Sequence, residues 1–415
     1  MLIITRLFYQ LGLFFYRIAI GMASLGGNNK ATLFRAGRKQ LFERLKIDLK
    51  HNTAPVFWMH CASLGEFEQG RPLLESLRIE YPTHKILLSF FSPSGYEQCK
   101  EYKGADWVYY LPLDNKKNAQ KWLDLIQPQK VFFVKYEYWY YYLTAMKKRK
   151  IEVYLVAAIF RPEQAFFKWY GVFFRRMLTC FTQIFVQDAV SQQLLESIDI
   201  MTSHIIGDTR LDRVLQIKKE IKPIPIIQRF CGNKATLVAG STWKQDEAIL
   251  KQFLEKNSCY QLIIAPHEID EKHLSEIEEK MILFGCVRYT NCHAEDNWHT
   301  KRVLILDTMG MLNQVYQYAK IAHIGGGFGA GIHNTLEAVV YEIPITFGSN
   351  YQKFKEATDL LQLGVAHEIK NATDLHIWIK KVEQNPNEYF EIQQKAKRYL
   401  QQNQGATRKI IDKIE

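Results

Sequence analysis

The cysteines of the sequence lack any pairing pattern. There are seven, an odd number, scattered from Cys61 to Cys292, and no two of them form a C-x-x-C pair. This spacing fits neither a disulfide framework nor a zinc ribbon. A reducing cytoplasm fits the pattern best.

The sequence also contains no recognisable nucleic-acid motif, because we find no zinc-finger spacing, no RNP-like aromatic strand and no long basic tail. It is nonetheless basic, with 54 Lys and Arg against 43 Asp and Glu and a formal net charge of +11. A charge of this sign favours an anionic partner. We expect a phosphorylated ligand or an anionic membrane surface, and no nucleic acid.

The N-terminus has no uninterrupted apolar run of membrane-spanning length. The first 20 residues are strongly apolar, but Arg6 and Arg17 interrupt them before the ~20 residues that cross hydrocarbon are complete. At ~100° per residue, Arg6, Gln10 and Arg17 share one stripe of a helix. This favours a helix lying in or dipping into the membrane interface, over a buried terminal helix or a signal peptide.

Residues 166–176 form a second apolar segment, in which aromatic side chains alternate with cations. Such alternation is typical of contact with lipid headgroups. An aromatic core helix with solvated ends explains the segment equally well, so both interpretations stay open.

The chain is long for a single domain, since one hydrophobic core usually stops growing at about 250–300 residues and this chain has 415. Short β-rich runs alternate with helical segments, which predicts mainly parallel sheets covered by helices. The first series has predicted strands at 56–60, 85–91, 106–111, 131–134, 152–157, 182–187 and 204–206. The second has predicted strands at 235–239, 261–265, 303–306, 321–324, 344–347 and 365–369, and helices at 246–255, 271–283 and 351–363.

We predict an α/β protein of two Rossmann-like domains facing each other across a cleft. The N-terminal helix covers 1–25, the first domain 26–215 and the second 216–415. The charged, proline-containing stretch 216–225 indicates the linker. We expect the final helices, at 389–402 and 406–414, to pack back toward the first domain.

The segment 324–338 predicts a strand that ends in glycines and then opens a helix. Glycines let backbone N–H groups approach an anion, and the positive end of a helix adds attraction for phosphate. The spacing is neither a Walker P-loop nor a G-x-G-x-x-G turn. A tight packing turn is the alternative to a nucleotide site. The candidate ligand-binding residues here are Gly325, Gly326, Gly327, His333, Asn334 and Glu337.

Two glutamates follow predicted strands of the first domain. Glu66 stands at a loop-to-helix junction, where a carboxylate could take a proton from an attacking hydroxyl or simply favour a helix start. Glu137 lies among aromatic residues, where burial would suit an acid/base role, although a structural hydrogen-bond acceptor is equally plausible.

Successive segments of the chain resemble the motifs of bacterial 3-deoxy-D-manno-octulosonic acid (Kdo) transferases, in the same order, from about Trp58 to Leu363. They are H-C-A-S-L-G-E-F-E-Q-G-R-P from His60, P-L-D from Pro112, E-Y-W from Glu137, G-D-T-R-L-D from Gly207 and G-I-H-N-T-L-E-A from Gly331. Further matches are A-G-S-T from Ala239, L-D-T-M-G from Leu306 and the run from Pro344 to Ala357.

The resemblance implies a GT-B fold and an inverting transfer of Kdo from CMP-Kdo to the tetraacyl-disaccharide bisphosphate precursor of lipid A. It implies no cofactor and no bound metal, and a location on the cytoplasmic face of the inner membrane. By position, Glu66 matches the catalytic base and Glu137 a second essential acid. The implied substrate-binding residues are Ser63, Gly65, Arg71, Ser241, Thr242, His267, Met309, Gly325, Gly326, Gly327, His333, Asn334 and Glu337.

The sequence departs from the family pattern at two places. Many relatives carry E-T-E-L-W-P where this chain has residues 135–140, so that only the second glutamate, Glu137, is kept, and R-H-P-E-R is replaced at 267–271. Two alternative functions also stay open. They are another GT-B glycosyltransferase that uses a UDP-sugar, and a non-catalytic membrane-binding protein.

Overall fold

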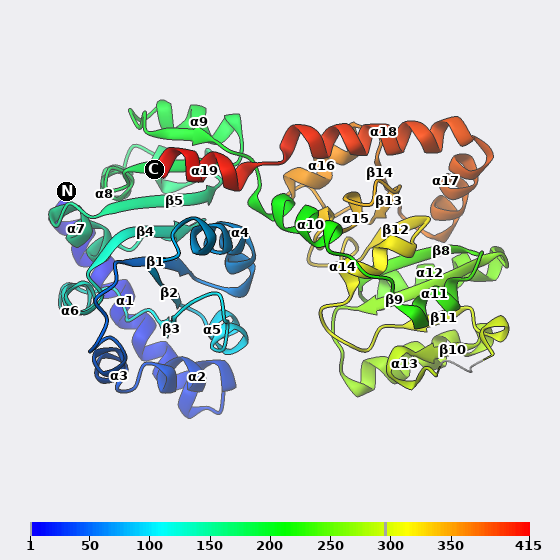
Figure 1. Cartoon of the computed structure of the whole chain (residues 1–415), viewed down its shortest axis with the longest axis horizontal. Coiled ribbons are helices and arrows are strands. Elements are labelled where there is room, and N and C mark those ends of the chain that lie inside the picture. The colour runs from blue at the N-terminus through cyan, green and yellow to red at the C-terminus, as the bar shows by residue number, and fades with distance from the viewer. Residues whose placement is uncertain (1, 294–296) are drawn as a thin grey trace. The chain divides into compact units, whose positions relative to one another are not determined.

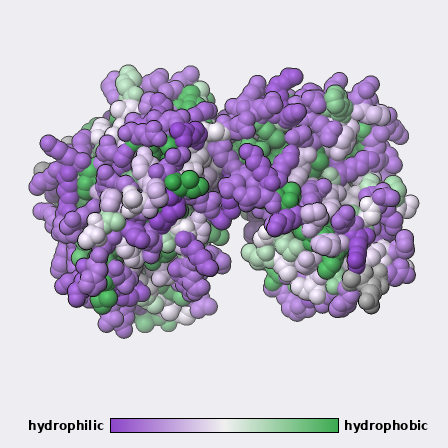
Figure 2. Space-filling model, viewed as in Figure 1, coloured by the Kyte–Doolittle hydropathy of each residue, from purple (hydrophilic) through white to green (hydrophobic). Residues whose placement is uncertain are grey.

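The computed structural model describes residues 2–293 and 297–415, with the side chains of Leu2 and Ile3 left out. Met1, part of the predicted N-terminal helix, lies outside the described residues. The chain forms two compact units, the first from Met1–Asp212 and Gln404–Glu415 and the second from Arg213–Asn403 (Figure 1). Hydrophilic residues cover most of the visible face of each unit (Figure 2).

The first unit is built on a parallel sheet of seven strands in the order β3-β2-β1-β4-β5-β6-β7. Its strands are β1 (Val56–Cys61), β2 (Lys85–Phe90), β3 (Trp107–Tyr110), β4 (Pro128–Val134), β5 (Glu152–Ala158), β6 (Gln183–Val186) and β7 (Ser203–Ile205). Its helices are α1 (Leu2–Leu25), α2 (Asn29–Gly37), α3 (Leu41–Asp48), α4 (Leu64–Glu80), α5 (Pro93–Cys99), α6 (Lys116–Ile126), α7 (Tyr140–Lys148), α8 (Val172–Leu178), α9 (Ala189–Glu196) and α19 (Ala406–Ile414). Helix α10 (Thr209–Lys219) begins in this unit and continues into the second. All seven strands predicted for this unit are present, with ends shifted by a few residues.

Each face of this sheet carries its own hydrophobic core. Successive side chains of a strand point to opposite faces. Trp58 of β1 accordingly lies in a core with Trp122 of α6 and Tyr142 of α7, whereas Phe57 lies in a second core on the other face. Because both faces are covered, every residue of β1 is buried.

The last helix, α19, packs on the first unit, as we expected, and thereby corrects our domain boundary. Ile410, Ile411 and Ile414 line one side of this helix and lie in the second core, with Phe57. Asp212 accepts hydrogen bonds from the N–H groups of Gly405 and Thr407, at 2.6 and 2.7 Å. We assigned residues 216–415 to a single second domain. The structure divides them between the two units, because the isoleucine stripe of α19 is buried in the first unit.

The second unit has a parallel sheet of seven strands in the order β10-β11-β9-β8-β12-β13-β14. They are β8 (Ala235–Thr242), β9 (Tyr260–Pro266), β10 (Cys286–Arg288), β11 (Val303–Ile305), β12 (Ile321–Ile324), β13 (Ile345–Phe347) and β14 (Ala366–Glu368). The helices are α11 (Pro225–Cys231), α12 (Lys244–Lys256), α13 (Glu271–Met281), α14 (Leu312–Val315), α15 (Leu336–Val339), α16 (Lys355–Gln362), α17 (Ala372–Gln384) and α18 (Pro386–Asn403). The half-exposed edge strand β10 was not predicted.

The predicted linker is partly wrong. Helix α10 continues to Lys219, because lysine, glutamine and isoleucine are acceptable helix formers, so the first half of 216–225 is helical. The irregular segment that follows is short and ends where Pro225 starts α11. Helix α18, which we also expected to pack toward the first domain, is part of the second unit.

Helix α1 is attached to the first unit along one side. The hydroxyl of Tyr9 donates a 2.6 Å hydrogen bond to Asp114, and its ring packs against Phe173 of α8. Further along the helix, Tyr16 stacks on Phe91. Among the described residues, only the stretch from Ile4 to Leu25 is long and apolar enough to cross a membrane, by length and composition.

The other side of α1 is apolar and exposed. Its large exposed hydrophobic residues are Ile4, Leu7, Phe8, Leu11, Phe14, Phe15, Ile18, Met22 and Leu25. The aromatic segment 166–176 fits partly our core-helix interpretation and partly our interpretation as a contact with lipid headgroups. Phe166 and Phe173 are core residues, whereas the side chain of Trp169 is 85% exposed and Tyr170 is also exposed.

Candidate active site

Glu66 stands in the first turn of α4, directly after strand β1. Its carboxylate accepts a hydrogen bond from the N–H of Ala62 in the same loop. Burial raises the pKa of Glu66 to about 8, and the nearby charge of Glu137 adds to the rise, whereas the Ala62 N–H and Lys135 oppose it. A carboxylate of such basicity can remove a proton from a hydroxyl near neutral pH.

Glu137 follows β4, the strand that pairs with β1 in the sheet. It is 5% exposed, and its Oε2 accepts hydrogen bonds from His60 Nε2 at 2.8 Å and from Trp139 Nε1 at 2.5 Å. Glu66 and Glu137 therefore lie at the same edge of the sheet, as we expected. The two bonds also give Glu137 the structural role that we had left open, holding His60 and Trp139.

His60 is a residue of this site that the sequence reasoning did not select. It is completely buried, and its Nδ1 lies 2.8 Å from Ser89 Oγ, which in turn accepts from the indole N–H of Trp58 at 2.7 Å. The chain of bonds fixes the ring of His60 against Glu137. The sequence signal that could have indicated this network is a histidine within an apolar strand pattern.

The other residues predicted in this loop differ in their surroundings. Ser63 precedes α4 with no side-chain capping bond, and a Cβ atom at Gly65 would meet nothing within 4 Å. Both positions are thus open to a ligand. Arg71 instead forms a 2.8 Å ion pair with Glu75 on its own helix, and its guanidinium lies over the ring of Tyr102.

The glycine turn of the second unit packs closely against its neighbours. A Cβ atom at Gly325 would lie 2.3 Å from the carbonyl oxygen of Ser241, and one at Gly327 would lie 2.5 Å from the backbone nitrogen of Gly348. Gly326 has a φ of +89°, a conformation that favours glycine. Packing therefore explains these glycines, as our alternative interpretation expected.

The predicted anion cradle is weaker than we expected. The helix after the turn, α15, has only 4 residues and begins at Leu336, so the dipole of a full helix is missing. The N–H of Gly325 donates to Gly240, and the N–H of Gly326 donates to the buried carboxylate of Asp246 at 3.1 Å. Two of the three glycine N–H groups are therefore used within the protein.

Asp246, on α12, organises this turn and was not predicted. Although burial opposes ionisation, hydrogen bonds from His323 and from the N–H groups of Gly326 and Trp243 lower the pKa of Asp246. The carboxylate thus stays ionised and ties α12 to the end of β12.

Four of the predicted residues surround one pocket of the second unit, with a volume of about 330 Å³. Ser241, His267 and Met309 line it at or just after the carboxyl ends of β8, β9 and β11, the place where ligands bind in such sheets. Glu337 lines the same pocket from α15. Thr242, in contrast, is completely buried. A larger pocket of about 510 Å³ is lined by the glycine turn and by residues of α12 and α13.

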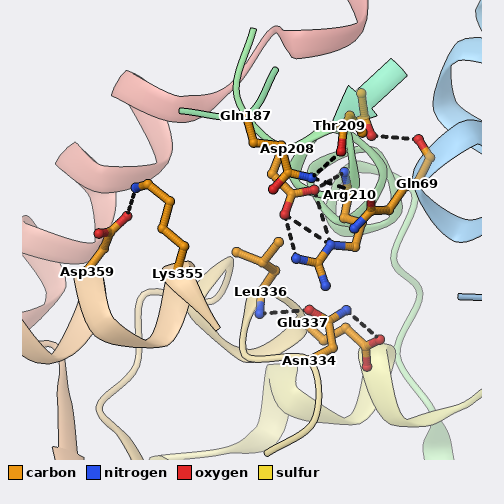
Figure 3. Close-up of polar contacts among 11 residues, drawn as sticks. Gln69, Gln187, Asp208, Thr209, Arg210, Asn334, Leu336, Glu337, Lys355 and Asp359 are labelled. Carbon is orange, nitrogen blue, oxygen red and sulfur yellow. Dashed lines mark hydrogen bonds and ion pairs between the residues drawn. The ribbon is translucent and has the colours of Figure 1, made fainter. Parts of the chain in front are cut away.

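Asn334 orients Glu337 at this pocket. The side-chain amide of Asn334 donates to Glu337 Oε1 at 3.0 Å, and its oxygen accepts from the N–H of Leu336 at 3.1 Å (Figure 3). The carboxylate is therefore held in place by the loop that precedes α15.

His333 belongs to an aromatic stack with His267 and Trp243. Its ring centroid lies 4.3 Å from that of His267, which lies 4.7 Å from Trp243. The indole N–H of Trp243 is 3.3 Å from His333 Nε2. Burial, with His267 nearby, lowers the pKa of His333 to about 4, so a neutral ring accepts from Trp243. The sequence reasoning missed Trp243, because this contact spans 90 positions.

The G-D-T-R-L-D segment has a structural role within the first unit. Arg210 pairs with Asp208 at 2.5 Å, and the hydroxyl of Thr209 donates to the carbonyl of Gln69 at 2.6 Å (Figure 3). The Thr209 bond attaches the start of α10 to α4, the helix that carries Glu66.

Comparison with known proteins identifies the class of this site. A family model described as 3-deoxy-D-manno-octulosonic-acid transferase (kdotransferase) matches residues 39–213, most of the first unit. A 3-deoxy-D-manno-octulosonic acid transferase of Aquifex aeolicus is 28% identical over 332 residues, which are 78% of this chain and 85% of that protein. A transferase of the same name from Chlamydia trachomatis is 25% identical, over 85% of this chain and 83% of that protein.

Solved structures show the same fold. A glycosyltransferase from Rickettsia africae superposes with a TM-score of 0.58 at 13% identity, covering 87% of this chain and 98% of that one. A UDP-GlcNAc 2-epimerase from Neisseria meningitidis has a TM-score of 0.60 at 14% identity, covering 87% of this chain and 99% of that one. The two parallel seven-stranded sheets are those of the GT-B fold, and the family model and the named relatives support a glycosyltransferase. Its first unit matches the Kdo transferase family model, and the two relatives named above are Kdo transferases.

Proposed function

We propose that the protein moves Kdo from CMP-Kdo to a hydroxyl of the tetraacyl-disaccharide bisphosphate precursor of lipid A, with inversion. The proposal is supported by the names of the relatives and chiefly by one observation. A glutamate whose pKa is raised to about 8 stands at the end of β1, in the unit that the Kdo transferase model matches. Acceptor activation by this group is what such a transfer requires.

In this mechanism Glu66 removes the proton of the acceptor hydroxyl as its oxygen attacks the anomeric carbon of Kdo. The new C–O bond forms while the bond to the phosphate oxygen of CMP breaks, and CMP leaves with the electron pair. A single in-line displacement of this kind inverts the anomeric configuration. Glu137 holds His60 and Trp139 beside the acceptor, so its loss should affect acceptor use more than CMP binding.

For the donor, we propose the pocket lined by Ser241, His267, Met309 and Glu337. Its volume of about 330 Å³ is near the lower end of the range of small-molecule sites. The Glu337 carboxylate, oriented by Asn334, is suited to accept hydrogen bonds from ribose hydroxyls. Contact of the donor phosphate with Gly325–Gly327 stays a prediction.

We also propose that the protein works at the cytoplasmic face of the inner membrane. The apolar side of α1 is exposed along its length, and Trp169 and Tyr170 are exposed as well. The ring contact of Tyr9 with Phe173 joins α1 to the helix that follows these two aromatic residues. Aromatic side chains of this kind are frequent at membrane interfaces.

The test is mass spectrometry of the lipid A precursor after incubation with the protein and CMP-Kdo, with and without EDTA. A product heavier by Kdo, formed by the native protein and strongly reduced in Glu66→Gln, is expected in both conditions. The use of a UDP-sugar would give no such product and would show tighter binding of UDP than of CMP. A protein that only binds membranes would modify no lipid with any activated sugar.

A further inference from the structure

A basic groove is lined by residues of α1, α6 and α7 and by Arg149, which follows α7. Figure 1 shows where these three helices lie in the first unit. It has a volume of about 460 Å³, and its lining includes four cations, Arg6, Lys116, Lys148 and Arg149, and no Asp or Glu. The transfer chemistry proposed above makes no use of this groove, since Glu66 and Glu137 do not line it.

The cations of the groove come from three separate elements. Arg6 lies on α1, Lys116 is the first residue of α6, and Lys148 is the last residue of α7. Arg149 forms a 2.7 Å ion pair with Asp124, a carboxylate that is itself 65% exposed. For Arg6, Lys116 and Lys148, no carboxylate partner occurs among the residues that the structure describes. Three of the four cations in the groove are therefore not neutralised by a carboxylate in the described part of the chain.

Two further features favour an anion here. The first turn of α6 contains no acidic residue, so its free N–H groups add positive potential beside Lys116. Tyr141, which also lines the groove, accepts a hydrogen bond from the side chain of Gln10. The hydroxyl proton of Tyr141 has no acceptor in the described part of the chain and is available to a ligand.

The neighbouring surface is apolar. Leu7 and Phe8 follow Arg6 on α1 and are 52% and 68% exposed, and Leu11, Phe14 and Phe15 continue this surface. A ligand that fits both features has an anionic head and an apolar tail. Guanidinium and ammonium groups are strong donors to phosphate oxygens, and phosphate is the usual anion at a membrane surface.

We propose that this groove binds the phosphate headgroup of an anionic membrane lipid while the acyl chains lie against the apolar side of α1. The proposal rests on the membrane attachment proposed above. It adds a defined site to the general attraction between a basic protein and an anionic surface, and it sets which part of the first unit faces the membrane.

The experiment measures binding of the full-length protein to vesicles of phosphatidylcholine alone and of phosphatidylcholine with phosphatidic acid. The variant Lys116→Gln/Lys148→Gln should keep its binding to neutral vesicles. It should lose most of the gain that phosphatidic acid gives the native protein, roughly 30-fold for two lysines near the surface. Donor and acceptor sugars are absent, so a failure of the proposed transfer reaction does not affect the result.

The matched control is Lys103→Gln/Lys409→Gln, which removes the same charge from two exposed lysines. Lys409 lies on α19, which packs on the sheet face opposite α6 and α7. Equal losses in the two double variants would mean diffuse attraction and would overturn the groove as a site. If inorganic phosphate stabilises the native protein but phosphatidic acid gives no gain, the ligand is a soluble phosphate and the lipid assignment is wrong. If the native protein binds no vesicle at all, the membrane attachment fails as well.

Discussion

At the scale of single residues, the behaviour of Glu66 decides whether the proposed chemistry holds. Its pKa is raised to about 8, and the carboxylate form is the base. As pH falls below about 8 the group becomes protonated, so kcat/KM should fall about tenfold per pH unit and should level off above pH 8. Glu66→Gln should remove this dependence and lower kcat by ~10²–10⁴-fold.

A pH series of initial rates measures this prediction, with CMP affinity determined in parallel. Glu80→Gln is the control, because Glu80 lies at the far end of the same helix and should leave the profile unchanged. A Glu66→Gln variant with normal kcat, or a native rate that is independent of pH between 6 and 8, would exclude Glu66 as the base.

Glu337 carries the second prediction at this scale. Glu337→Ala should weaken CMP binding by roughly tenfold to a hundredfold, the usual effect of losing a charged hydrogen bond, and should leave acceptor binding unchanged. Asn334→Ala should have a smaller effect in the same direction, since the Asn334 amide orients the carboxylate. Calorimetric titration with CMP tests both variants. Unchanged affinity in Glu337→Ala would remove this residue from the donor site.

The positions of Glu66 and Glu137 could be predicted from the sequence, because both follow strands and the carboxyl ends of parallel strands share one edge of a sheet. The bonds around them could not. His60 meets Glu137 across 77 positions, and Asp246 meets the glycine turn across 80. Such contacts depend on the packing of the whole unit, whereas local patterns report only on neighbours in the chain.

At the scale of elements, the strands were predictable because apolar β-rich runs are local features. Errors occurred where tertiary contacts decide. The three-residue strand β10 carries too little pattern, and α16 begins at Lys355, four positions later than predicted, since the preceding loop packs against the glycine turn at Gly331. The unit to which α19 belongs depends on which core its isoleucines enter, and the sequence does not state this.

The attachment of α1 gives a prediction for this scale. Tyr9 is one of three donors to Asp114, together with the N–H groups of Tyr141 and Tyr142. Burial raises the pKa of Asp114 to about 6, and the hydrogen bonds from these three donors oppose that rise. The buried carboxylate therefore relies on its donors to stay ionised. Tyr9→Phe should therefore destabilise the protein by about 1–3 kcal/mol, measured by denaturant unfolding at pH 7.5. Tyr16→Phe on the same helix, whose ring packs on Phe91, should cost much less, and equal costs would contradict a specific role for the Tyr9 bond.

At the scale of the whole molecule, two features act together at the membrane. The chain has a net charge of +11, which favours approach to an anionic surface, and α1 presents an apolar side that is not covered by the protein. An electrostatic contact alone is lost in high salt. An inserted apolar face is not, so salt separates the two contributions.

The last prediction uses this difference. Phe8 and Phe15 of α1 are 68% and 63% exposed, so Phe8→Gln/Phe15→Gln should leave the thermal midpoint of unfolding nearly unchanged. Binding of this variant to neutral vesicles in high salt should fall by roughly a hundredfold, because each ring removed from hydrocarbon costs about tenfold in affinity. Ile47→Gln/Ile79→Gln is the matched control, since these residues are 70% and 77% exposed on other helices of the same unit. Vesicle flotation measures both variants. An equal loss of vesicle binding in the control would show that α1 is not the inserted element. A loss confined to the phenylalanine variant would assign membrane insertion to the first helix. The basic groove beside α1 would then select the lipid headgroup.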